Sequence, residues 1–283
     1  FLGFRWREIT RRRGRALDTF DLDPICGARA IAQEHRDLNG VLVARAMSQP
    51  LLVAGPGDDG PRLCLMERER FEECEGERKC RVTGVRTVHD LFGNEVWVHD
   101  EGDLADPSDD RLAQTTYVPN LAAYVVSLPA ETTLSEATAA GSSWSWRVLE
   151  ARRWRYDQHD PMEPPGPRGE RTATEVWDDV AGDFVTSSFR YDPTGNLIEA
   201  VGPATDHAPA GLTETTTYDC TFGRFPVQAC NGQTCTETGW DLVRGRVTSV
   251  TDANGATVAS SYDPLGRVTR VDDGDVHAAA QHP

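Results

Sequence analysis

The sequence predicts an all-β protein in which antiparallel hairpins follow one another in a meander. Three observations lead to this fold class. Gly (25 residues) and Pro (17 residues) are spread through the 283-residue chain, as in proteins rich in turns. Few stretches show the 3.6-residue period of an amphipathic helix. Finally, one turn motif recurs along the chain.

The motif is clearest in SSYDPLGRVTRV, residues 260–271. Tyr262 ends an apolar-polar alternation, and Asp263 to Gly266 have the composition of a type I turn, because Pro presets φ and Asp bonds the turn backbone. Gly266 suits a positive φ that other residues resist. Arg267 then starts the next alternating segment. This stretch is therefore predicted to be a β-hairpin.

Aromatic-Asp pairs precede Tyr262-Asp263 at successive intervals of 22, 22, 27 and 35 residues. In four units a Gly follows the pair, then a polar and an apolar residue; Trp177-Asp178 repeats this order out of step. Self-similarity of this kind is typical of repeat architectures. We assign a structural role to the repeated residues. They are Tyr156, Asp157, Trp177, Asp178, Gly182, Tyr191, Asp192, Gly195, Tyr218, Asp219, Gly223, Arg224, Trp240, Asp241, Gly245, Arg246, Tyr262, Asp263, Gly266 and Arg267.

The repeat predicts a continuous antiparallel sheet over residues 180–275. Its turns are expected at Asp192–Gly195, Asp219–Gly223, Asp241–Gly245 and Asp263–Gly266, with reverse hairpins between them, the clearest at Asn254-Gly255. Since the Arg starts the strand paired with the aromatic residue, we expect a cation–π contact within each hairpin, of about 0.5–1 kcal/mol.

Upstream the pattern is looser, as in His89-Asp90 with Gly93. We divide the chain into residues 1–88, a β-rich region, and residues 89–283, a repeat segment with a Pro/Gly loop near 161–171. Several apolar residues around position 150 share one parity, which predicts a long two-faced strand or a pair of strands. These residues are Trp144, Trp146, Val148, Trp154 and Tyr156.

The units FRYDPTGNLIEAV, TTYDCTFGRFPVQA and SSYDPLGRVTRV resemble YD repeats of the Rhs family, which includes shell components of Tc toxin complexes and the teneurins. FLGFRWREIT resembles the stretch before the repeats in toxin-type members with an SpvB-like region. The resemblance covers residues 89–120 and 150–275, and 1–25 more weakly. It implies a β-strip that curls into part of a hollow spiral β-shell enclosing a C-terminal effector. The implied partners are the remaining repeats and the effector of a parent chain that is secreted or on the cell surface.

The sequence offers no catalytic constellation. It contains no GxSxG, HExxH, Walker or EF-hand motif, and GPGDDG at residues 55–60 is a poor dinucleotide loop because Asp58 and Asp59 would repel phosphate. We therefore expect no enzyme activity, no cofactor and no metal. A net charge of −16 argues against nucleic-acid binding. No apolar run approaches the roughly 20 residues of a membrane span.

Seven cysteines bear on the compartment of the protein. Cys74 and Cys80, like Cys230 and Cys235, are close enough to pair across a loop, and disulfides or buried thiols fit better than zinc because no CxxC spacing occurs. An odd count leaves at least one thiol without an intrachain partner. Disulfides would indicate an oxidising compartment.

Two functions fit this reading. The first is a non-enzymatic shell segment that encloses an effector. The alternative is a cell-surface carbohydrate-binding or adhesion module that uses exposed aromatic residues such as Trp144, Trp146, Trp154 and Tyr156. A chain that starts at Phe1 without Met is also expected to be an interior piece or a processed product.

Overall fold

The computed structural model describes residues 6–11, 14–23, 27–54, 62–75, 79–140 and 143–273. Within them the chain forms nineteen β-strands and one short 3₁₀-helix, η1 (Pro107–Asp109). The expected all-β fold is therefore confirmed. No helix in this part of the chain is long and apolar enough to cross a membrane. The GPGDDG loop, Cys26 and the first five residues of FLGFRWREIT lie outside the described residues.

The chain forms two compact units. Unit 1 comprises residues 1–154 and 159–169, and unit 2 comprises residues 155–158 and 170–283. The division proposed at residue 89 falls inside unit 1, within the last residues of strand β6 (Cys80–His89). That division concerns sequence pattern and stays a prediction.

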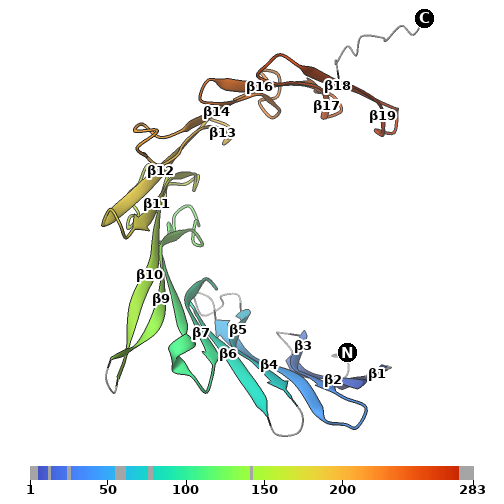
Figure 1. Ribbon diagram of the computed structural model, residues 1–283, viewed down its shortest axis with the longest axis vertical. Coiled ribbons are helices and arrows are strands. Elements are labelled where there is room, and N and C mark those ends of the chain that lie inside the picture. Colours follow the sequence, from blue (N-terminus) through green and yellow to red (C-terminus); the bar gives the residue numbers. More distant parts are fainter. Residues whose placement is uncertain are drawn as a thin grey trace, which may run out of the picture. The chain divides into compact units, whose positions relative to one another are not determined.

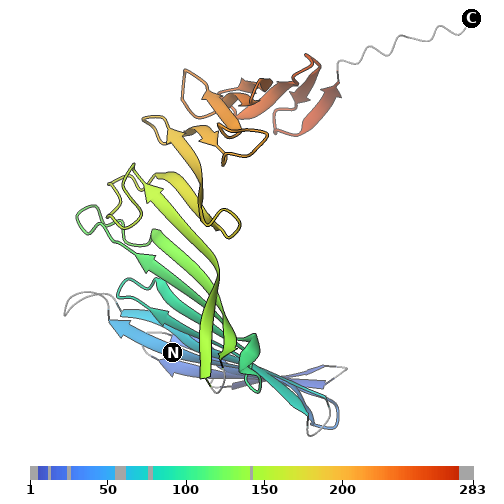
Figure 2. The ribbon, with the colours of Figure 1, turned by 60° about the vertical axis from the view of Figure 1, so that its left-hand side comes forward.

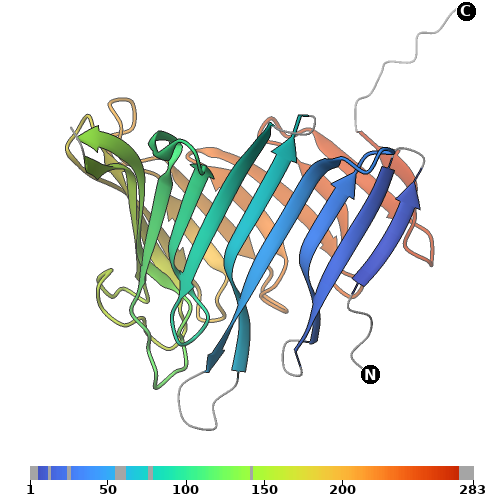
Figure 3. The same cartoon turned by 90° about the horizontal axis from the view of Figure 1, so that it is seen from below.

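In unit 1 each strand pairs antiparallel with the next one along the chain (Figure 1, Figure 3). Antiparallel neighbours need only short connections, which suits the frequent turn signals. The strands are β1 (Trp6–Arg11), β2 (Gly14–Asp23), β3 (Gly27–Arg36), β4 (Leu42–Ala54), β5 (Arg62–Cys74), β6 (Cys80–His89), β7 (Glu95–Asp103), β8 (Arg111–Tyr117), β9 (Pro129–Ala140) and β10 (Ser143–Tyr156), whose last two residues belong to unit 2.

Unit 2 is also a meander of antiparallel strands, most of which are shorter than those of unit 1 (Figure 2). Consecutive strands pair antiparallel from β11 to β19, so the predicted meander over residues 180–275 is confirmed as far as residue 273. The strands are β11 (Arg171–Asp178), β12 (Asp183–Tyr191), β13 (Leu197–Val201), β14 (Thr213–Tyr218), β15 (Pro226–Asn231), β16 (Thr234–Asp241), β17 (Arg246–Thr251), β18 (Thr257–Tyr262) and β19 (Val268–Asp272).

The described residues form a single layer with little core. The buried apolar side chains are Leu112, Ala130, Tyr156 and Ala173, and no described side chain is less than 2% accessible. Strands contact their sequence neighbours, and no second layer of described residues covers either unit. The stability of the fold must therefore come from contacts between neighbouring strands and hairpins.

A β-bulge in β10 changes the face of the sheet on which its later side chains lie. Val148 pairs with Ser135, whereas Glu150 pairs with Leu134, so one extra residue lies in β10 between these two pairs. A one-residue shift moves every later side chain to the opposite face. One long strand, β10, contains all five of the residues that share one parity in the sequence, and Trp154 consequently lies on the face opposite to Trp144 and Trp146.

Two disulfides close hairpins at their tips. Cys74 pairs with Cys80 between β5 and β6, and Cys230 pairs with Cys235 between β15 and β16. In each case the two cysteines are directly opposed in register, with Cα atoms 4.0 Å apart. Cys64 is disulfide-bonded as well, and Cys220 carries a free, exposed thiol.

A fragment of residues 180–283 should not unfold as a sharp, reversible monomer. Its strands contact only adjacent strands, and every residue of β19 is exposed, so its ends lack cover. We expect aggregation or a broad calorimetric transition, with the whole chain as the reference. A cooperative, reversible, monomeric transition of the fragment would contradict this dependence on neighbours.

Candidate functional site: the coupled turns

The turn at Asp263 shows how the repeated residues act. Asp263 N donates to Arg267 O at 2.9 Å, and Gly266 N donates to Asp263 O at 3.0 Å. The carboxylate atom Oδ1 of Asp263 also accepts from the amides of Leu265 (3.0 Å) and Arg267 (2.9 Å). Gly266 has φ +91°, which only Gly adopts freely. One carboxylate thus satisfies turn amides that the strand ladder leaves unpaired.

Four further turns have the same geometry, at Asp37, Asp90, Asp192 and Asp252. In each, Oδ1 of the aspartate accepts from the amides two and four residues later, at 2.8–3.0 Å. The pattern Asp-x-x-Gly therefore marks turns at both edges of the strip. The sequence marks one of these turns by Asn254-Gly255, but Asp252, two residues before the Asn, carries the hydrogen bonds.

The larger turns keep the aspartate and add amides. Asp219 accepts from four backbone amides, those of Thr221, Phe222, Arg224 and Phe225, at 2.6–3.1 Å. Asp241 accepts from the amides of the two residues at positions 243 and 244. The carboxylate is the constant part of a turn whose length varies.

These hydrogen bonds stabilise the charged carboxylates. The amide of Phe225 and its neighbours lower the pKa of Asp219 to about 2. The pKa of Asp192 is also lowered, chiefly by the Thr194 hydroxyl, and that of Asp252 is lowered chiefly by the Ala256 amide. The turns therefore hold their aspartates ionised well into acid.

In four turns the aromatic residue before the aspartate lies at a β-bulge. Register shifts occur just before Tyr191, Tyr218, Trp240 and Tyr262. Each of these side chains donates its one polar hydrogen to a backbone carbonyl near the start of the strand after the preceding turn. The donors and acceptors are Tyr191 Oη to Arg171 O (3.1 Å), Tyr218 Oη to Leu197 O (3.2 Å), Trp240 Nε1 to Pro226 O (2.8 Å) and Tyr262 Oη to Val247 O (2.7 Å). We call these bonds the backward ties.

A second set of bonds runs forward along the same edge. The residue after the turn glycine reaches a carbonyl of the next turn: Asn196 Nδ2 donates to Gly223 O at 2.6 Å, and Arg246 Nη1 donates to Asp263 O at 3.4 Å. In unit 1, Asn94 Nδ2 donates to Val126 O at 2.8 Å. The sequence identifies this position only as polar and does not show that its side chain reaches the next hairpin.

The cation–π contact joins neighbouring hairpins, which corrects the expectation of a contact within one hairpin. Arg246 Cζ lies 5.5 Å from the ring centroid of Tyr262, the aromatic residue of the following unit. Arg267, the expected partner, instead bonds Asp263 Oδ2 at 2.7 Å. The backward tie turns the ring of Tyr262 toward the preceding hairpin, so it meets that hairpin's arginine. A Cβ at Gly266 would also collide with the Arg246 guanidinium.

The remaining repeat residues occupy related positions. Tyr156 is buried, and Asp157 Oδ1 accepts from Glu170 N at 3.0 Å across the Pro/Gly loop. Trp177 and Asp178 lie at the opposite edge from Tyr191, because turns alternate between edges along a meander. This explains why that unit is out of step. Asp178 still accepts turn amides, and Gly182, φ +67°, closes the turn.

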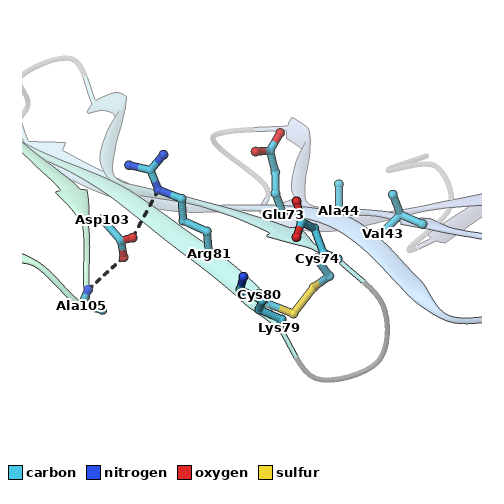
Figure 4. A pocket seen from close by; sticks show the side chains of 10 residues that line it. Val43, Ala44, Glu73, Cys74, Lys79, Cys80, Arg81, Asp103 and Ala105 are labelled. Carbon is cyan, nitrogen blue, oxygen red and sulfur yellow. Dashed lines mark hydrogen bonds and ion pairs between the residues drawn. A yellow bond between two sulfur atoms is a disulfide. The ribbon is translucent and has the colours of Figure 1, made fainter.

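A separate hollow of about 670 Å³ lies beside the Cys74–Cys80 disulfide in unit 1 (Figure 4). Within it Arg81 forms an ion pair with Asp103, with 3.3 Å between Arg81 Nε and Asp103 Oδ2. Glu72, Cys74 and Cys80 are the one group of described residues whose potential metal-ligand atoms lie within 4.8 Å of one another. Their sulfur atoms are joined in the disulfide, so this group does not form a metal site here.

Comparisons with known proteins agree with the repeat geometry. The family model described as RHS Repeat matches residues 240–275, which contain the turns at Asp241, Asp252 and Asp263. The fold of 96% of the chain is similar to a crystal structure of TcdB2-TccC3 (TM-score 0.69, 12% identity), to TcdB2-TccC3-Cdc42 (0.70, 12%) and to the Photorhabdus luminescens Tc holotoxin pore (0.69, 13%). Residues 240–275 therefore match the RHS repeat, and the chain as a whole shares the fold of these solved structures.

The chain covers 21%, 20% and 20% of those three solved chains. It thus spans about a fifth of their length. No curated protein matches the sequence. The structural likeness, at identities of 12–13%, shows that the fold is shared.

Replacing Tyr262 by Phe should loosen the β17–β18 hairpin locally. The change removes the backward tie to Val247 O and keeps the ring over Arg246, so the opening free energy should fall by about 1 kcal/mol. Hydrogen exchange of amides at 246–262 should become about fivefold faster. Tyr124→Phe is the matched control, since Tyr124 is 71% exposed and its hydroxyl donates to no described residue. Equal exchange in both variants would contradict a coupling role.

The chain should lose stability as pH falls from about 4 to about 2. Aspartates whose pKa is lowered on folding stabilise the protein above their unfolded pKa of about 3.9, and this contribution disappears as pH approaches the folded pKa. Asp219→Asn should reduce stability at pH 7 and flatten the acid limb of thermal melts. Asp206→Asn, in an exposed loop, is the control; an acid limb unchanged by Asp219→Asn would count against the mechanism.

Proposed function

We propose that the chain is a non-enzymatic wall segment of an Rhs/YD-repeat shell that encloses a C-terminal effector in a longer, secreted toxin-type protein. The observation that carries the proposal is the way the repeated residues are used. Their aspartates accept turn amides and their aromatic residues donate to neighbouring hairpins, so they are committed to holding one hairpin against the next. Similarity of fold to TcdB2-TccC3 supports a toxin-complex setting.

Other features are consistent with this role. The disulfides Cys74–Cys80 and Cys230–Cys235 suit an oxidising, extracellular environment. A single layer of strands has two accessible faces and can separate a content from solvent, and strands twist with a fixed hand, so a long strip curls. The proposed partners are the further repeats and the effector of the parent protein, with no nucleic acid.

A second candidate, a carbohydrate-binding or adhesion module, is favoured by one group of side chains. Trp144 and Trp146 are 49% and 43% exposed on β10, and the His99 ring lies 5.5 Å from Trp146 and 5.4 Å from Trp97. Exposed aromatic rings stack well on sugars. The bulge in β10 removes Trp154 from this surface, and Tyr156 is buried, so the surface is smaller than the sequence suggested.

Electron microscopy of the parent protein tests the wall proposal. We expect density for residues 90–275 to curve around a cavity that holds the effector. A flat sheet, a filled sandwich, or a hydrolytic activity lost on mutation within this chain would refute it. The same preparation on a glycan array separates the candidates: binding lost in Trp146→Ala but kept in Trp177→Ala would favour the adhesion module.

A further inference from the structure

Three arginines form a cluster on one face of unit 1, although the chain has a net charge of −16. Arg68 on β5 is directly opposite Arg86 on β6 in the strand register. Arg70, two residues after Arg68, shares their face because side chains alternate along a strand. Like charges at directly opposed positions destabilise a sheet. The cluster therefore needs an anionic partner.

One carboxylate reaches the cluster. Glu101 Oε1 accepts from Arg68 Nη2 at 3.0 Å. Glu101 lies over Gly84, where a Cβ would come within 2.6 Å of its Oε2 atom, so the missing side chain at Gly84 makes room for this contact. Neither Arg70 nor Arg86 forms an ion pair or hydrogen bond with any described residue.

Nearby acids serve other residues. Glu72 Oε2 lies 3.5 Å from Arg45 Nη1, and Asp110 Oδ2 lies 2.8 Å from His99 Nε2. The Nε atoms of Arg68 and Arg70 are buried and have no hydrogen-bond partner. Both guanidinium groups are thus partly removed from water, and a positive charge held in this way gains more from an anion than a fully hydrated one.

The cluster borders a hollow with room for a small ligand. Its volume is about 210 Å³, and Met47, Ser48 and Gln49 line it together with Arg68 and Arg70. The planar guanidinium fork matches the two oxygens of a carboxylate or phosphate, and such charge-assisted pairs are stronger than neutral hydrogen bonds. We propose that this hollow is an oxyanion site, in which Arg70 supplies the free guanidinium group and Arg68 completes the lining, while Arg86, opposite Arg68 on the same face, adds a neighbouring positive charge.

Calorimetric titration of the whole chain with inorganic phosphate, and separately with succinate, tests the site at constant ionic strength set with NaCl. We expect one ligand per chain. Arg70→Gln should weaken binding by about tenfold or more, and Arg86→Gln, which removes a neighbouring positive charge on the same face, should weaken it by a smaller factor. Glu101→Gln should tighten binding, because it frees Arg68. Arg81→Gln is the control: its guanidinium, also on β6, is already within 3.3 Å of Asp103 and 3.6 Å of Asp109, so binding should not change.

The two ligands distinguish the sources of the anion. Binding of phosphate alone identifies a phosphate site, binding of succinate alone identifies a carboxylate site, and binding of both supports an oxyanion site without selectivity. Absence of binding to either ligand overturns the proposal, as does binding that Arg70→Gln and Arg86→Gln leave unchanged or that Glu101→Gln weakens. If circular dichroism shows that Arg70→Gln misfolds, the binding measured for Arg86→Gln, a change at an exposed residue, decides whether the proposal holds.

Discussion

The hydrogen bond from the aromatic side chains of Tyr191, Tyr218, Trp240 and Tyr262 to a carbonyl of the preceding hairpin is the contact on which the repeat depends. A strip without a buried core cannot rely on side-chain packing to fix one hairpin against the next. A Tyr hydroxyl or a Trp indole N–H gives this contact a direction, while the ring covers apolar surface. This explains why Trp240 replaces Tyr without loss of the contact: its Nε1 reaches Pro226 O at 2.8 Å, within the range of the tyrosines.

The turn aspartates stabilise the edges of the sheet, where the hairpins turn. A tight turn leaves backbone amides without ladder partners, and such groups need an acceptor. A carboxylate has enough lone pairs to accept several amides at once, as Asp219 does with four. Part of the acidity of the chain is therefore structural: these negative charges are held at turns by backbone dipoles, where the lowered pKa of Asp219 and Asp192 records their stabilisation.

Local chemistry was readable from the sequence, and contacts between hairpins were not. The turn from Asp263 to Gly266 can be predicted because the residues that determine it, Asp, Pro and Gly, all lie within these four positions. The partner of Tyr262 is Arg246 because the backward tie sets the direction of the ring, and composition does not show that direction. The bulge after Val148 reverses later parity with no Gly or Pro to signal it. The arginine cluster is equally hidden, since it follows from the register of β5 on β6.

Register also decides the chemistry of each face of a one-layer wall. Arg86 is opposite His99 in the ladder, and the His99 ring contacts Trp146, so the arginine cluster and the exposed tryptophans share one face of unit 1. Asp100 is opposite Val85 and lies on the other face. A slip of one residue between β6 and β7 would exchange these surfaces. The Asp90 turn, whose carboxylate holds the amides of Phe92 and Asn94, resists that slip. The turn residue Asp90 therefore helps to determine which side chains each face of unit 1 presents.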